Sequence, residues 1–284
     1  MTDVANKERT GQAEHAGRTG GVSLEVSHLV KRYANASKPV LDDISFTVPH
    51  GKVLVIVGPS GSGKSTLLRT IAGLEPIQGG TIALNGDVIE TGRPGTESAG
   101  RGKRSSELRT KVGMVFQSYD LFPNKTVLGN ITLAPTLVQK RDKAEAEKEA
   151  VALLERVGLA DRKDAWPHEL SGGQRQRVAI CRALILHPEI LLFDEVTAAL
   201  DPEMVREVLD VMLELADSGQ TMLIVTHEMP FARAIADRII MLDGGGIVEQ
   251  SDDAERFFTD PQTERAKQFL HTFEFNRHRA NGEA

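Results

Sequence analysis

The sequence predicts an α/β fold built around a parallel β-sheet. Three apolar segments carry that prediction: GKVLVIVG (51–58), EILLFDE (189–195) and TMLIVTH (221–227). Short runs of branched apolar residues are typical of strands covered on both faces, as in parallel sheets. A helix expected from about Glu203 to Asp217 separates the last two strands, which gives the strand–helix alternation of an α/β protein.

Bulk composition limits the class of protein. The chain has 284 residues and a net charge of -6, whereas proteins that wrap nucleic acid usually carry a basic excess. Its single cysteine, Cys181, excludes an intrachain disulfide and fits a reducing setting. The longest apolar runs fall far short of the roughly 20 residues that span a bilayer, and we find no signal peptide. Any membrane role is therefore expected to go through a partner.

The first part of the chain is expected to be rich in strands. Residues 1–21 are polar and Gly-rich, so we expect a disordered tail. The alternation of apolar and polar residues over 22–48 predicts antiparallel strands. A helix should run from Lys64 to about Leu74. The segment GGTIALNGDVI returns to strands, with Asn85-Gly86 as a hairpin turn. Residues 91–107, rich in Gly, Ser and cations, predict a flexible surface insertion.

The second part is expected to become helical before strands resume. The segment KVGMVFQ (111–117) predicts another buried strand, and a helical zone should follow over about 118–170. Within it, the apolar periodicity of KAEAEKEAVALLERVGLA predicts an amphipathic helix that Gly158 ends. Later segments are expected to form a hairpin (238–250), a short amphipathic helix (260–273) and a C-terminal tail (274–284).

The segment GPSGSGKST (58–66) matches the phosphate-loop pattern G-x-x-x-x-G-K-[ST]. It follows a predicted strand and opens a predicted helix, whereas a plain Gly-rich turn is the alternative. Backbone N–H groups and the helix N-terminus are expected to cradle phosphates. Lys64 should reach the β- and γ-phosphates, Ser65 should ligate Mg²⁺, and Thr66 should bond the α-phosphate. The residues expected to contact nucleotide are Gly58, Pro59, Ser60, Gly61, Ser62, Gly63, Lys64, Ser65 and Thr66.

The segment ILLFDE places two carboxylates at the end of a buried strand. Asp194 should lie near the Mg²⁺, and Glu195 should orient or activate the attacking water; a mere helix cap is the alternative. Together with the phosphate loop, this predicts a protein that binds and hydrolyses a nucleoside triphosphate. GTPases usually carry Asn-Lys-x-Asp, but NKTV has Val127 at the last position, which favours ATP.

The segment LSGGQ (170–174), in order with the other motifs, resembles the signature of the ATP-binding subunits of ABC transporters over about residues 23–273. The resemblance implies a P-loop NTPase (RecA-like) core with an antiparallel β subdomain, all within 22–273. It also implies an inserted α-helical subdomain at about 118–170. Two chains would face each other head to tail, so that Ser171, Gly172, Gly173 and Gln174 contact the partner's ATP. We expect the helix after this motif to begin at about Gln174.

Four further residues receive roles from the resemblance. Tyr33 would stack on adenine, Gln117 would contact Mg²⁺ and water, His227 would contact the γ-phosphate, and Asp201 would lie in the loop that crosses to the partner. Each has a plainer alternative: a packed tyrosine, a solvated amide, a structural histidine and a helix N-cap. The catalytic group would be Glu195, His227, Lys64 and Gln117, and the metal ligands Ser65, Gln117 and Asp194.

Three segments resemble the ATPases of polar amino acid importers: LFPNKTVLGNITLAP, VTHEMPFARAIADRIIMLDGG and FFTDPQTERAKQFL. The resemblance implies an ATP- and Mg²⁺-dependent subunit at the cytoplasmic face of the membrane. Its partners would be a second ATPase subunit, membrane-spanning permeases and, indirectly, a solute-binding protein, with no nucleic acid. Two alternatives remain: an exporter or lipoprotein-release ATPase, and a soluble ABC ATPase of DNA repair, which usually carries a long coiled-coil insertion.

Overall fold

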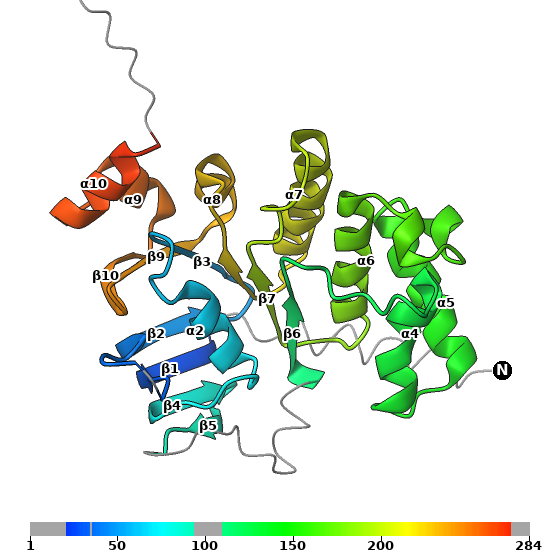
Figure 1. Ribbon diagram of the computed structural model, residues 1–284, viewed down its shortest axis with the longest axis horizontal. Helices are drawn as coiled ribbons and strands as arrows, with labels where there is room; N and C mark the ends of the chain where they lie inside the picture. The colour runs from blue at the N-terminus through cyan, green and yellow to red at the C-terminus, as the bar shows by residue number, and fades with distance from the viewer. Residues whose placement is uncertain (1–20, 35, 94–109, 274–284) are drawn as a thin grey trace, which may run out of the picture.

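The computed structural model describes residues 21–34, 36–93 and 110–273, and Figure 1 shows their arrangement in two sheets with helices around them. The N-terminal tail expected at 1–21 therefore lies almost wholly outside the described residues. The same holds for most of the insertion expected at 91–107 and for the C-terminal tail at 274–284.

The larger sheet has six strands in the order β10-β9-β3-β8-β7-β6, and every neighbouring pair is parallel except the edge pair β9–β10. The strands are β3 (Val53–Val57), β6 (Val112–Val115), β7 (Ile190–Asp194), β8 (Met222–Val225), β9 (Arg238–Asp243) and β10 (Gly246–Ser251). Every residue of β3, β7 and β8 is buried, as expected of strands covered on both faces. The predicted parallel sheet and the hairpin at 238–250 are confirmed.

The smaller sheet is antiparallel, in the order β2-β1-β4-β5. Its strands are β1 (Val22–Lys31), β2 (Leu41–Pro49), β4 (Gly79–Leu84) and β5 (Asp87–Thr91). The turn between β4 and β5 holds Asn85 at φ 52° and Gly86 at φ 84°. Two successive positive φ angles are those of a type I′ hairpin turn, so the turn predicted from Asn-Gly is confirmed.

The helices fill the connections between strands. They are α2 (Lys64–Ile71), α4 (Val127–Leu137), α5 (Lys143–Arg156), η1 (Ala160–Arg162), η2 (Pro167–Glu169), α6 (Gly172–Leu184), α7 (Pro202–Asp217), α8 (Met229–Ile235), α9 (Ala254–Thr259) and α10 (Glu264–His271). Helix α2 ends before the predicted Leu74 because Gly73 adopts φ 66°, outside helical geometry. Gly158, at φ 67°, ends α5 as predicted. The short helices α8 and α9 were not expected.

The larger sheet separates two apolar clusters. Leu54 and Ile56 of β3 point to the side where α2 and the smaller sheet pack, and α2 contributes Leu67, Leu68 and Ile71 to that cluster. Val53, Val55 and Val57 point to the other side, into a cluster shared with α7, α8, α9 and α10. Helix α2, which the phosphate-loop segment opens, is therefore clamped between the two sheets.

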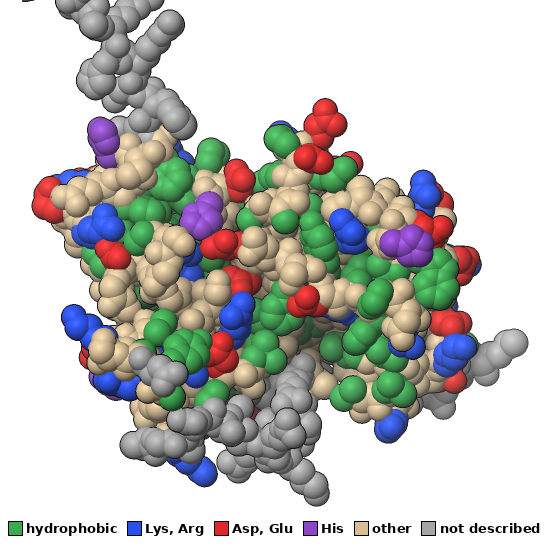
Figure 2. All heavy atoms as spheres, viewed as in Figure 1, with side chains coloured by type: hydrophobic (Ala, Val, Ile, Leu, Met, Phe, Trp, Pro, Cys, Tyr) green, Lys and Arg blue, Asp and Glu red, His purple; other side chains and the backbone are tan. Residues whose placement is uncertain are grey.

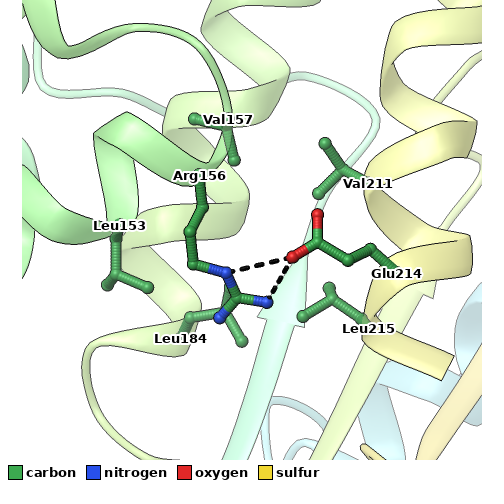
Figure 3. A pocket seen from close by; sticks show the side chains of 7 residues that line it. All are labelled: Leu153, Arg156, Val157, Leu184, Val211, Glu214 and Leu215. Carbon is green, nitrogen blue, oxygen red and sulfur yellow. Dashed lines mark hydrogen bonds and ion pairs between the residues drawn. The ribbon is translucent and has the colours of Figure 1, made fainter. Parts of the chain in front are cut away.

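A third apolar cluster joins α4, α5 and α6, beyond β6 at one edge of the molecule (Figure 1). Its members come from residues 127–185, so this cluster runs past position 170 along α6. Figure 3 shows where this cluster meets the rest of the fold. Nη2 of Arg156, on α5, donates a 2.8 Å hydrogen bond to Oε1 of Glu214, on α7. The pair borders a small pocket that contains no phosphate-loop residue. Among the described residues, no helix is both long and apolar enough to cross a bilayer.

Candidate active site

The phosphate-loop segment connects β3 to α2, and its glycines adopt conformations that other residues rarely reach. Gly58, Gly61 and Gly63 have φ angles of 144°, 78° and 100°. A Cβ on Gly58 would lie 2.0 Å from the carbonyl oxygen of Leu242, and one on Gly63 would lie 2.9 Å from that of Val40. Backbone approach and positive φ therefore both require glycine here. The tight turn places the backbone N–H groups of the loop at the N-terminus of α2. Backbone N–H groups and the helix dipole make such a terminus a binding site for anions.

Lys64 is folded back over this loop. It is 4% exposed, and its Nζ donates 3.0 Å hydrogen bonds to the carbonyl oxygens of Gly58 and Pro59. Burial lowers the pKa of Lys64, against the opposing attraction of Glu195 and Asp194. The Ser62 hydroxyl oxygen is also buried, and it has no hydrogen-bond partner in the described part of the chain. A buried cation and an orphaned hydroxyl in one loop are what an absent anion would leave.

Ser65 and Asp194 bring two oxygen ligands together. The Ser65 hydroxyl, in the first turn of α2, donates to Oδ1 of Asp194, at the end of β7, over 2.7 Å. Asp194 is 5% exposed; burial raises its pKa, and the Ser65 hydrogen bond opposes that rise. Gln117 follows β6, the strand beside β7, and its side chain is exposed. Hydroxyl, carboxylate and amide oxygens are the donors that Mg²⁺ prefers, so the residues present fit that ion.

Glu195 and His227 form a second polar pair beside the loop. Nε2 of His227, which follows β8, lies 2.9 Å from Oε1 of Glu195, which follows β7. Glu195 adopts φ 48°, a left-handed conformation that costs a non-glycine residue about 1–2 kcal/mol. The Glu195 N–H donates a 3.0 Å hydrogen bond to the carbonyl of Val225, which helps to hold the residue in this conformation. Because β7 and β8 are adjacent and parallel, their ends deliver an acid–base pair to one edge of the sheet.

Tyr33 lies just after β1, close to the first turn of α2. Its hydroxyl donates to Oε2 of Glu75 over 2.5 Å and lies 3.5 Å from Oγ1 of Thr66. Tyr33 is 41% exposed. The pKa of Tyr33 is raised, first by burial and then by the hydrogen bond to Glu75. Glu75 belongs to no motif, and sequence reasoning missed it because nothing in the pattern after Gly73 points back to Tyr33.

The LSGGQ segment is a helix start. Ser171 is the N-cap of α6: its hydroxyl accepts from the Gln174 N–H at 3.2 Å, while Oε1 of Gln174 accepts from the Ser171 N–H at 3.0 Å. This reciprocal pair is a capping box. The expected helix start at about Gln174 is therefore wrong by two residues, because the glycines already belong to the first turn. Gln174 spends its side-chain oxygen on this cap.

The two glycines of this segment have a structural reason that the sequence did not show. A Cβ on Gly172 would lie 2.9 Å from Cδ2 of Leu200, and one on Gly173 would lie 2.9 Å from Cβ of Met204. The Gly173 N–H also points at Sδ of Met204, 3.5 Å away. Helix α6 therefore starts close to the start of α7, and the approach is least adjustable at Gly173, because Cβ of Met204 cannot rotate away.

The expected site residues fall into two groups in space. The phosphate loop, Asp194, Glu195 and His227 come together, and Tyr33 stands beside Thr66. Residues 171–174 begin α6, which Figure 1 places across β6 and β7 from α2. Asp201 is the exposed N-cap of α7, and within the described residues its side chain makes no capping hydrogen bond. One chain therefore presents a loop with an acidic pair at one place and the capped start of α6 at another.

Several known proteins resemble this chain in sequence. A family model described as ABC transporter matches residues 41–198. The glutamate transport ATP-binding protein GluA of Corynebacterium efficiens is 55% identical over 230 residues, covering 81% of this chain and 91% of that protein. The arginine transport ATP-binding protein ArtM of Bacillus subtilis is 50% identical over 247 residues, covering 87% of this chain and 98% of that protein.

A solved structure is also similar. It is described as the dimeric structure of a post-hydrolysis state of the ATP-binding cassette MJ0796 bound to ADP and Pi. The superposition has a TM-score of 0.70 at 30% sequence identity, and covers 80% of this chain and 97% of that chain.

Proposed function

Since the chain belongs to the ABC transporter family and hydrolyses ATP as its members do, we propose that it powers uptake of a polar amino acid or a related small solute through membrane-spanning partner subunits. The observation that carries the chemistry is the meeting of three groups at one sheet edge. These are the phosphate loop with Lys64, the Ser65–Asp194 pair at 2.7 Å and the Glu195–His227 pair at 2.9 Å.

Each group has a distinct task in hydrolysis. The loop N–H groups and the Lys64 ammonium bind the phosphates and neutralise their charge. Ser65, Asp194 and Gln117 would hold Mg²⁺, which supplies charge neutralisation at the β- and γ-phosphate oxygens when bound. Glu195 accepts a proton from the attacking water. His227 orients the Glu195 carboxylate through their hydrogen bond and stands ready to contact the γ-phosphate.

The second half of each site comes from another chain. Ser171, Gly172 and Gly173 lie at the N-terminus of α6, which attracts anions. In the same chain, Figure 1 shows α6 across β6 and β7 from α2, the helix that the phosphate loop opens. A head-to-tail pair, homodimeric or mixed, places this start of α6 on the γ-phosphate of the facing chain. Asp201 lies in the loop that reaches the partner. ATP binds the closed pair better than ADP does, so hydrolysis opens it.

The helical region is the surface that meets the membrane-spanning partners. Phe122, Leu137, Val138 and Trp166 are between 41% and 60% exposed, and all lie between β6 and α6. Figure 2 shows apolar side chains at the surface over α4 and α5. Gln117 stands at the entrance to this region and would link its tilt to the state of the nucleotide. This docking puts the chain at the cytoplasmic face of the membrane, with a solute-binding protein as an indirect partner.

Similar ATPases indicate the class of solute. The names of two similar ATPases specify glutamate and arginine, whose side chains carry opposite charges. Because similar ATPases serve solutes of opposite charge, we infer that the ATPase subunit itself does not contact the solute. The transported solute is therefore a polar amino acid that the permease selects.

The test is to isolate the chain from membranes and reconstitute it with the permease that co-purifies. We expect ATPase activity that rises when a polar amino acid and its binding protein are added, and a Glu195→Gln variant that does not respond. Export of a bound substrate would contradict the direction. Recovery with nucleic acid and without a membrane partner would contradict the proposal. We do not expect that outcome, because Figure 2 shows acidic and basic side chains interspersed over the visible face.

A further inference from the structure

We propose that Glu75 and Lys31 are positioning residues that hold the Tyr33 ring in the orientation that receives the adenine base. The inference rests on the proposed nucleotide-binding role of Tyr33 and adds to it two residues outside every nucleotide motif of the chain. Three sets of contacts carry it: one at the ring hydroxyl, one on a face of the ring, and one that ties Glu75 to α2.

The first contact fixes the ring at its hydroxyl end. The Tyr33 hydroxyl donates to Oε2 of Glu75 over 2.5 Å, and Oγ1 of Thr66 lies 3.5 Å away. Tyr33 lies two residues past Lys31, the last residue of β1, and is not itself part of a strand. Without this tether its side chain would sample several rotamers, because Tyr33 is 41% exposed.

The second contact covers one face of the ring. Nζ of Lys31 lies 4.7 Å from the Tyr33 ring centroid, within the range of a cation–π contact. Lys31 is 3% exposed, and its ammonium also bonds the Pro76 carbonyl at 2.9 Å and Oε2 of Glu75 at 3.2 Å. One carboxylate oxygen therefore serves both the hydroxyl and the ammonium. Because Lys31 occupies one face, a base can stack only on the other.

The third contact ties this arrangement to the phosphate loop. Glu75 follows the end of α2, where the N–H groups of Leu74 and Glu75 bond the carbonyl of Arg69 at 2.9 and 3.3 Å. Arg69 also approaches Oε1 of Glu75, at 4.0 Å. The N-terminus of α2 carries the phosphate loop and the turn after its C-terminus carries Glu75. A single buried helix therefore sets the distance between the base platform and the phosphate cradle.

Preorganisation of this kind raises the affinity for the base and does not change the affinity for the phosphates. Ordering one side chain on binding costs about 0.5–1.5 kcal/mol, which corresponds to roughly 2- to 12-fold in affinity. Glu75→Ala should therefore weaken ATP binding by that factor with little change in kcat at saturation. Glu75→Gln keeps an oxygen that accepts the Tyr33 hydroxyl, so it should retain most of the affinity.

The experiment compares ATP with inorganic triphosphate, which has no base, on the full chain by calorimetry with Mg²⁺ present. We expect Glu75→Ala to weaken ATP binding and to leave triphosphate binding unchanged. In a Tyr33→Ala background, Glu75→Ala should add nothing further. A matched control is Glu264→Ala, which removes the carboxylate from an exposed pair with Lys267 at 2.8 Å on α10 and should change neither ligand.

The outcomes separate the inference from the proposal beneath it. Equal weakening of ATP and triphosphate would mean that Glu75 merely supports the loop, and would overturn the inference while Tyr33 kept its role. An additive effect of Glu75→Ala in the Tyr33→Ala background would overturn it too. If Tyr33→Ala itself left ATP affinity unchanged, the stacking role and this inference would both fail, whereas the ATPase chemistry at Glu195 would stand.

Discussion

The Ser65 hydroxyl donates a 2.7 Å hydrogen bond to Oδ1 of Asp194, across 129 positions of the chain. It joins the first turn of α2 to the end of β7, so two oxygen atoms of the kind that Mg²⁺ prefers lie side by side. The same carboxylate is 5% exposed, and burial raises its pKa. The carboxylate of Asp194 is therefore well placed to bind a cation, but burial destabilises its charged form.

Asp194→Asn should weaken activation by Mg²⁺. The asparagine oxygen can still accept the Ser65 hydrogen bond, so the change removes the charge and keeps the geometry. If Asp194 contacts the ion through a water, the loss should be about 10- to 100-fold in metal affinity or activity. Titration of ATPase rate with Mg²⁺ measures it. Asp210→Asn, which removes a carboxylate from an exposed pair with Arg206, is the control and should titrate like the native chain.

The same substitution should stabilise the free protein at neutral pH. A carboxyl whose folded pKa lies above its unfolded pKa binds a proton more tightly when folded, so stability falls as pH rises through that window. At neutral pH the Asp194 carboxylate is therefore destabilising, and Asp194→Asn should raise Tm without Mg²⁺ or nucleotide. The difference should vanish in acid below the ordinary range of aspartate. With Mg²⁺-ATP the order should reverse, because the native chain binds more tightly. A lower Tm at neutral pH without ligand would contradict the desolvation argument.

Glu195→Gln should separate binding from hydrolysis. The glutamine can keep the 2.9 Å contact with His227, but it cannot accept a proton from water. General-base catalysis contributes about 10²- to 10⁴-fold, so kcat should fall by that factor while the affinity for ATP stays within about 2-fold. Single-turnover hydrolysis and calorimetry measure the two quantities. Glu203→Gln, in the first turn of α7, is the control. Normal turnover in Glu195→Gln would remove it as the base.

Much of the fold was predictable because its signals are local. The branched runs around Val55 and Phe193 favoured buried strands, Asn85-Gly86 favoured a hairpin turn, and the 58–66 motif favoured a strand–turn–helix context. Helices α8 and α9 escaped prediction because they have seven and six residues, too few for an apolar period to show.

The site was predictable to the extent that its residues lie in motifs. The pattern gave Lys64, Asp194 and Glu195 directly, whereas Glu75 and Lys31 meet Tyr33 only through the way β1 and α2 pack. The glycines at 172 and 173 show the other limit. The sequence suggested room for a phosphate, and the structure adds contacts with Leu200 and Met204 that sequence spacing cannot reveal.

Gly173→Ala should destabilise the chain more than Gly172→Ala. Alanine is favoured over glycine inside a helix by about 1 kcal/mol, so a position with space would gain stability. The new Cβ at 173 would meet Cβ of Met204 at 2.9 Å, an atom that cannot rotate away, and overpacking of this kind costs about 1–3 kcal/mol. At 172 it would meet Cδ2 of Leu200, the far end of a flexible side chain. Urea unfolding of both variants measures the difference; equal stabilities would contradict the packing argument.

Ser171→Arg tests whether the start of α6 serves a facing chain. A long cation at this N-cap would block approach of a second phosphate loop, so ATP-dependent dimers should disappear from size-exclusion profiles of the Glu195→Gln background. ATP binding to the monomer should persist, because the chain's own phosphate loop opens α2, which lies across β6 and β7 from α6 (Figure 1). The substitution also removes the cap hydrogen bond to the Gln174 N–H, which costs about 1 kcal/mol. Ser171→Ala removes the same cap without the bulk. Since both variants lose the cap, any dimer loss found only in Ser171→Arg reports on the interface. Loss of monomer ATP binding in Ser171→Arg, with Ser171→Ala intact, would instead place this helix start in its own chain's site.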